Sequence, residues 1–166
     1  MRWLGLPDDV KSKIKQETLI TLGSPTSRIG SYAATVIASI AAIELPENQW
    51  SDLIQILLGF INNRENISLR IATLTAIGYI CESIVSSHVL GRECRLIPLR
   101  GYQKPEVLAS RSNEILTAVV QGARKEEINA EVNASAMRAL FNSLEFVREN
   151  FEREVTSAVL FESQTH

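Results

Sequence analysis

The sequence predicts an all-α protein, a solenoid of antiparallel helix pairs stacked in a right-handed superhelix. Three similar helix starts support this prediction: Pro-Asp-Asp-Val at 7–10, Pro-Glu-Asn-Gln at 46–49 and Pro-Glu-Val-Leu at 105–108. The first two prolines are 39 residues apart and the third follows after 59, which leaves 20 residues beyond a regular repeat. Repeats of about 40 residues with two helices each are typical of HEAT and armadillo arrays. Such pairs bury their apolar faces only by stacking, and the stack presents an extended binding surface.

The first repeat, residues 1–44, is predicted to hold helices at 7–22 and 26–43. Pro7 suits a first helical position because its missing N–H would have no partner there. One stripe of the first helix is apolar at helical spacing: Val10, Ile14 and Leu22. The second helix has alanine or isoleucine on nearly every side, so we expect it to be covered by neighbours all round.

The second and third repeats, 45–84 and 105–151, follow the same plan. Their helices are predicted at 46–62, 66–84, 112–123 and 129–150. The apolar positions of these helices form the rest of the predicted core: Leu53, Ile54, Leu57, Leu58, Ile61, Leu69, Ala72, Ile77, Ile80, Ile115, Leu116, Val119, Val120, Val132, Ala136, Leu140, Leu144 and Phe146. Ile37, Ile77 and Leu140 occupy equivalent positions in the three second helices.

Composition and charge exclude several classes of protein. The chain has 166 residues, of which 45% are hydrophobic and 6% aromatic, and a net charge of −2. A nucleic-acid-binding protein would need clustered lysine and arginine. Cys81 and Cys94 are too few and too far apart for a disulfide framework or a zinc site. Because no run of about 18 apolar residues predicts a membrane span, and Met1 begins no signal peptide, we expect a soluble intracellular protein.

The sequence contains no arrangement of residues that predicts catalysis. Gly91 and Gly101 do not follow a strand, as a dinucleotide-binding loop would require. His88 and His166 have no cysteine or carboxylate at the spacing of a metal site. We therefore expect no enzyme activity, no cofactor, no metal, and neither nucleic acid nor membrane as a partner.

Two stretches depart from the repeat pattern: 85–104, predicted as an irregular bulge, and 152–166, a divergent tail. The codons of Val85 and Val155 begin with GT, as a 5′ splice signal does, and Gln103 permits a CAG acceptor. The 20 additional residues also preserve the reading frame. One hypothesis is therefore retained intron sequence at both places. The alternative is a lineage-specific loop.

Four segments resemble the importin beta (karyopherin beta) family: 43–50 (IELPENQW), 76–83 (AIGYICES), 112–122 (SNEILTAVVQG) and 142–146 (NSLEF). The resemblance extends over 2–84 and 105–154, in order and with matching spacing. It implies a segment near the third to fifth HEAT repeats of a nuclear transport receptor. Such receptors import proteins into the nucleus, and are found in the cytoplasm, the nucleus and the nuclear pore. The alternative is another HEAT scaffold or adaptor subunit whose concave face clamps an enzyme.

The resemblance also implies where partners bind. Family members dock phenylalanine side chains of phenylalanine-glycine nucleoporins between neighbouring outer helices. One wall of such a slot matches Leu116, Thr117 and Val120, whereas the other would follow 151–154, where the resemblance ends. We therefore expect a half-site, although Leu116 and Val120 could instead pack against a neighbouring helix. A partial Ran site is expected on the second helices, and the repeats that hold import cargo or importin alpha are largely absent.

Overall fold

The computed structural model describes residues 3–93, 112–123 and 127–144. Its elements are η1 (Trp3–Gly5), α1 (Asp8–Leu22), α2 (Ser27–Glu44), η2 (Leu45–Glu47), α3 (Leu53–Asn62), α4 (Ile67–Glu93), α6 (Ser112–Gly122) and a helix over 130–144. These ranges contain no β-strand, and the predicted all-α class is confirmed. The predicted helix start at Pro105, the segment 94–104, Phe146 and the tail 152–166 lie outside the described residues.

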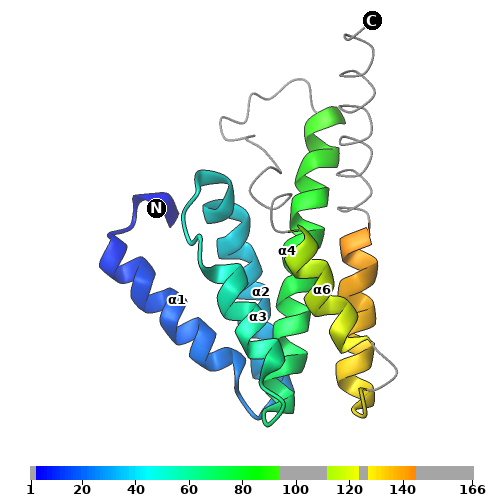
Figure 1. Cartoon of the computed structure of the whole chain (residues 1–166). Helices are drawn as coiled ribbons and strands as arrows, with labels where there is room; N and C mark the ends of the chain where they lie inside the picture. The colour runs from blue at the N-terminus through cyan, green and yellow to red at the C-terminus, as the bar shows by residue number, and fades with distance from the viewer. Residues whose placement is uncertain (1–2, 94–111, 124–126, 145–166) are drawn as a thin grey trace, which may run out of the picture.

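The helices form three pairs in two layers (Figure 1). α1, α3 and α6 are the first helices of their pairs, and α2, α4 and the helix 130–144 are the second helices. The most extensive interface joins α2 to α4, while α1 packs on α2, and α3 packs on both α4 and α6. The predicted stack of helix pairs is therefore present in the described part of the chain.

The hydrophobic core lies between these layers. Ile37 and Ile77 are 0% and 1% exposed, which confirms both as core residues. Leu140, at the equivalent position of the third pair, is half-buried and packs at the edge of the core. A Cβ built on Gly30 would lie 3.1 Å from the Cβ of Ala72, so small residues bring α2 and α4 close together.

The second repeat begins differently from the prediction. Pro46 lies in η2 rather than in the first turn of a long helix, and α3 begins only at Leu53. Asn48 and Trp50 both have a left-handed φ of 56°. Asn tolerates this conformation, whereas it is unusual for a bulky residue. The prediction of a helix from residue 46 was wrong because a proline that fits a first helical turn fits a 3₁₀ turn equally well.

The predicted bulge at 85–104 is wrong for its first nine residues, because α4 continues as a helix to Glu93. No proline interrupts 85–93, so nothing in the backbone chemistry forces the helix to end at residue 84. In Figure 1 the C-terminal end of α4 rises past α3 and α6. This continuation contradicts an irregular segment over 85–93, whereas the retained-intron hypothesis stays a prediction.

Two predicted burial patterns are also wrong. In α1, Val10 is 38% exposed while Lys11 is buried, its ammonium 2.8 Å from Asp8 Oδ1. In α2, one stripe is exposed at i, i+3, i+7 and i+14: Ile29, Tyr32, Val36 and Ile43. Among the described helices α2 packs chiefly on α1 and α4, which leaves this stripe uncovered.

One segment of the described chain, Ser27–Glu47, is long and apolar enough to cross a membrane by length and composition alone. Half of it is buried inside the fold. A core helix of a layered helical protein passes the same test, because it must be apolar to pack on two neighbours.

Candidate functional site

The predicted half-site lies on α6. Ile115 and Val119 point into the core, with 1% and 0% exposure. Leu116 is half-buried and packs against that core, whereas Thr117 is exposed and Val120 is 44% exposed. α6 therefore presents a shallow apolar ledge with a hydroxyl beside it. The expected opposite wall, at 151–154, lies outside the described residues.

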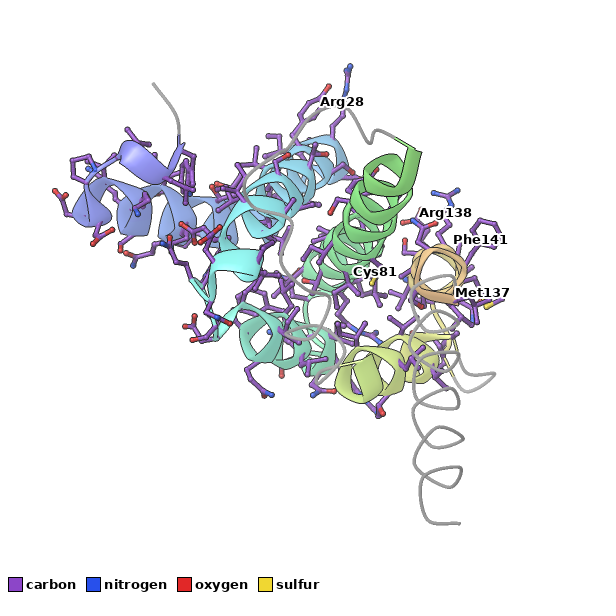
Figure 2. All side chains as sticks on the ribbon, turned by 90° about the horizontal axis from the view of Figure 1, so that it is seen from above. Arg28, Cys81, Met137, Arg138 and Phe141 are labelled. Carbon is purple, nitrogen blue, oxygen red and sulfur yellow. The ribbon has the colours of Figure 1, made fainter. Side chains whose placement is uncertain are left out.

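A second candidate surface is the exposed face of the second helices. It contains the α2 stripe of Ile29, Tyr32, Val36 and Ile43, and Tyr79 of α4, which is 39% exposed. Arg28 extends outward from the first turn of α2 (Figure 2). Contiguous exposed apolar side chains bordered by polar groups are typical of protein-binding surfaces. The partial Ran site was expected on the second helices, and this second-helix surface is the part of them that stays exposed.

A third exposed surface ends the described stack. Met137, Phe141 and Leu144 are 50%, 77% and 55% exposed, and the first two point away from α4 (Figure 2). The same helix packs inward through Val132, Ala136 and Ala139. The prediction of Leu144 as a core residue is therefore wrong for the described chain. In a solenoid this face is covered by the next repeat.

The buried carboxylate of Glu44 joins the first repeat to the start of the second. It accepts hydrogen bonds from Trp3 Nε1 and Lys15 Nζ, each at 2.9 Å, and is 0% exposed. The Lys15 ammonium also lies 5.1 Å from the ring centroid of Trp50. Its two partners, Trp3 and Lys15, are 41 and 29 residues from Glu44 in the chain, so the residue pattern alone did not reveal the network. Its role is structural because the carboxylate is fully enclosed by partners.

Other titratable groups likewise serve the fold. Burial raises the pKa of the Cys81 thiol to about 12. The thiol therefore stays protonated and unreactive near neutral pH, enclosed between α4 and the helix 130–144 (Figure 2). Within the described ranges, no three His, Cys, Asp or Glu side chains gather where they could hold a metal ion.

Stacked helix pairs in two layers define the class of protein: an α-solenoid of the HEAT type. No family model matches the chain. Importin subunit beta-1 of Schizosaccharomyces pombe is 44% identical over 152 residues, which cover 92% of this chain and 15% of that protein. Importin subunit beta-1 of Arabidopsis thaliana is 37% identical over 155 residues, covering 93% and 16% of the two chains.

Solved structures agree with the sequence relatives. A crystal structure of importin beta in an ammonium sulfate condition matches with a TM-score of 0.72 at 44% identity, over 90% of this chain and 15% of the other. The Kap95:Nup1 complex matches with a TM-score of 0.72 at 34% identity, over 97% of this chain and 17% of the other. A complex of Kap95p with RanGDP gives 0.70 at 33% identity with the same coverage. The chain belongs to the importin beta family, and it spans 15% to 17% of the length of these relatives.

Proposed function

We propose that this chain is a segment of a nuclear import receptor that binds Ran and nucleoporins and catalyses no reaction. The observation that carries the proposal is the 44% identity with importin subunit beta-1 across 92% of the chain. The shared helix-pair fold, at a TM-score of 0.72, supports it. Such a receptor works in the cytoplasm, the nucleus and the nuclear pore. We assign import cargo and importin alpha to the remaining length of the relatives.

The proposed Ran contact is the second-helix surface. A relative of the same fold is solved with RanGDP, and this surface holds the one aromatic side chain of α2, Tyr32, at 62% exposure. Tyrosine and arginine side chains, here the exposed Tyr32 and Arg28, commonly supply much of the binding energy of protein interfaces. The contact is partial because this chain corresponds to a small part of the relatives, so the expected affinity is low.

The proposed nucleoporin contact on α6 is a half-site of Leu116, Thr117 and Val120. Full burial of one phenylalanine side chain is worth about 1.5–3 kcal/mol, and ordering a flexible partner consumes part of that. A single half-built slot therefore binds barely, if at all. Useful affinity requires several slots that act together.

The test is retention of Ran, loaded with GTP or GDP, on the immobilised chain. We expect the chain to retain Ran, and Tyr32→Asp to reduce the retention at least tenfold. Ile20→Asp is a matched control, because Ile20 is 64% exposed but lies on α1, in the other layer. If neither nucleotide state of Ran is retained, while helicity and stability are normal, the proposed Ran contact on this chain is wrong.

A further inference from the structure

The outer face of the helix 130–144 carries one exposed apolar stripe. Met137, Phe141 and Leu144 are 50%, 77% and 55% exposed, and Ala134 before them is exposed as well. These four residues follow one another at intervals of three, four and three, which places them on one side of the helix. Figure 2 shows that Met137 and Phe141 project away from α4. The stripe therefore lies on the side of the helix that does not pack on the core.

The same spacing continues in the sequence beyond the described helix. Intervals of three and four alternate without a break from residue 134 to residue 158. Seven of these eight positions, here called the heptad stripe, are apolar: Ala134, Met137, Phe141, Leu144, Phe151, Val155 and Ala158. The eighth position is Arg148. No glycine or proline occurs between 130 and 166 to signal the end of a helix. The positions after Leu144 lie outside the described residues, so their place in the stripe comes from the sequence.

The spacing of the heptad stripe is typical of helices that pair with one another. Two helices that wind around each other meet along a narrow line of apolar residues, which recur every 3.5 residues on average. A helix that is covered by neighbours in a layered fold has a wider apolar face. α2 is an example, because it buries adjacent residues such as Ala33 with Ala34 and Ile37 with Ala38. The heptad stripe thus fits one partner helix rather than a layer of helices.

The charges along the heptad stripe favour a second copy of the chain in antiparallel orientation. In a parallel pair each residue meets its own counterpart, so two Arg148 guanidinium groups would face each other. In an antiparallel pair with full overlap, Arg148 faces the apolar Leu144 of the second copy instead. The same register places Arg138, exposed beside Phe141 (Figure 2), opposite Glu152 of the second copy. Symmetry repeats this contact between opposite charges at the other end of the pair.

We propose that the chain binds a second copy of itself through an antiparallel helix pair along the heptad stripe, from Ala134 to Ala158. Phe141 then packs against Phe151 of the second copy, and aromatic pairs add to the energy of the buried area. The stripe is about 37 Å long at a helical rise of about 1.5 Å per residue. Because two identical surfaces related by a two-fold axis close on each other, association stops at a dimer.

Sedimentation equilibrium of the full chain tests the surface. We expect a monomer–dimer equilibrium with a dissociation constant in the micromolar range. Phe141→Asp should raise this constant about tenfold or more, because it places a carboxylate in an apolar contact. Since Phe141 is 77% exposed in the single chain, the unfolding midpoint should stay close to that of the parent. Ile20→Asp, at a 64% exposed position on α1, is the matched control and should leave the constant unchanged.

A charge exchange tests the partner and the register. Arg138→Glu and Glu152→Arg should each weaken association about threefold or more, since each places like charges opposite one another at two symmetric sites. The double variant restores opposite charges and should associate as the parent does. An equimolar mixture of the two single variants should do the same, because every contact then joins opposite charges on different copies. Arg28→Glu, exposed on α2, controls for the change in net charge.

Four results would overturn the proposal. A chain that stays monomeric at several hundred micromolar would remove the dimer. Association that Phe141→Asp leaves unchanged would mean that another surface joins the copies. If the double variant associates as weakly as the single variants, the antiparallel register is wrong. If the double variant recovers but the mixture does not, Arg138 and Glu152 meet within one chain rather than between two copies.

Discussion

Arg70 holds Glu127 across the junction between the second and third repeats. The guanidinium of Arg70 donates two hydrogen bonds to the Glu127 carboxylate, and its Nε donates to the carbonyl of Ile61 at 3.0 Å. The two side chains are 10% and 13% exposed. One planar group therefore ties the end of α3 and the start of α4 to the turn before the helix 130–144, and it uses the fork geometry that only arginine offers.

This ion pair should make the free energy of unfolding fall when the pH is lowered in the acidic range. Hydrogen bonds from Arg70 hold the pKa of Glu127 below its ordinary value of 4.5. The stabilisation is therefore complete above pH 4.5 and is lost as the pH falls through the lower pKa of the folded state. The free energy of unfolding can be measured with urea between pH 7 and pH 3. Over this range it should fall less for Glu127→Gln than for the parent chain. Glu131→Gln, at an exposed position of the same region, should behave as the parent does. Equal pH dependence in all three chains would disprove the link.

Loss of the buried Glu44 carboxylate should destabilise the first repeat. Glu44→Ala leaves the Lys15 ammonium and the Trp3 indole without their acceptor, and breaking a buried ion pair in this way costs about 3–5 kcal/mol. Lys15 is 19% exposed in its side chain, so a value near the lower end is expected. Glu44→Gln keeps a hydrogen-bond acceptor for the Trp3 indole, so this variant should lose less stability than Glu44→Ala. Equal unfolding midpoints for the alanine variant and the parent would show that the network contributes nothing.

Two glycine substitutions should have opposite effects on stability. Alanine is favoured over glycine inside a helix by about 0.5–1 kcal/mol. At Gly59 a new Cβ meets no atom within 4 Å, so Gly59→Ala should stabilise the protein by about that amount. At Gly30 the new Cβ would be 3.1 Å from the Cβ of Ala72 and 3.3 Å from the carbonyl oxygen of Leu22. Gly30→Ala should therefore cost about 1–3 kcal/mol. A stabilised Gly30→Ala chain would mean that α2 and α4 separate easily.

Substituting core residues with alanine should cost less stability near the end of the described stack, because side chains are less buried there. Ile37→Ala and Ile77→Ala should each cost about 2–5 kcal/mol, because both side chains are enclosed. Leu140→Ala should cost less, since Leu140 lies half-exposed at the edge of the core. Chemical denaturation of the three variants provides the comparison. A larger loss at Leu140 than at Ile77 would show that the third pair is covered by more structure than α4 and α6.

Helical spacing predicted the parts of the fold that depend on local pattern. Ile37 and Ile77 are enclosed as expected because their helices repeat apolar residues at intervals that match the helical turn. The helix start expected at Pro46 was wrong, because a proline fits the first turn of an α-helix and a 3₁₀ turn equally well. The burial of Glu44 was not predictable, since its partner Lys15 is 29 residues away and comes close only when α1 packs on α2.

The candidate sites show the same limit. The resemblance suggested Leu116, Thr117 and Val120 as a half-site, but whether Val120 is exposed depends on how α6 lies in the stack. The exposed stripe of α2 looked like core for a related reason, since an apolar helix face is the same whether a helix or a partner protein covers it.

A titration of the methyl-labelled chain with GTP-loaded Ran tests the central claim most directly. The account predicts shifts at the methyls of Ile29, Val36 and Ile43 on the second-helix surface, and none at Ile20 or Ile56 on the first helices. Tyr32→Asp should remove these shifts while the remaining spectrum stays that of the folded chain. Unchanged methyl signals on α2 at saturating Ran, or shifts restricted to α1 and α3, would contradict the assignment of this chain as a Ran-binding segment of an import receptor.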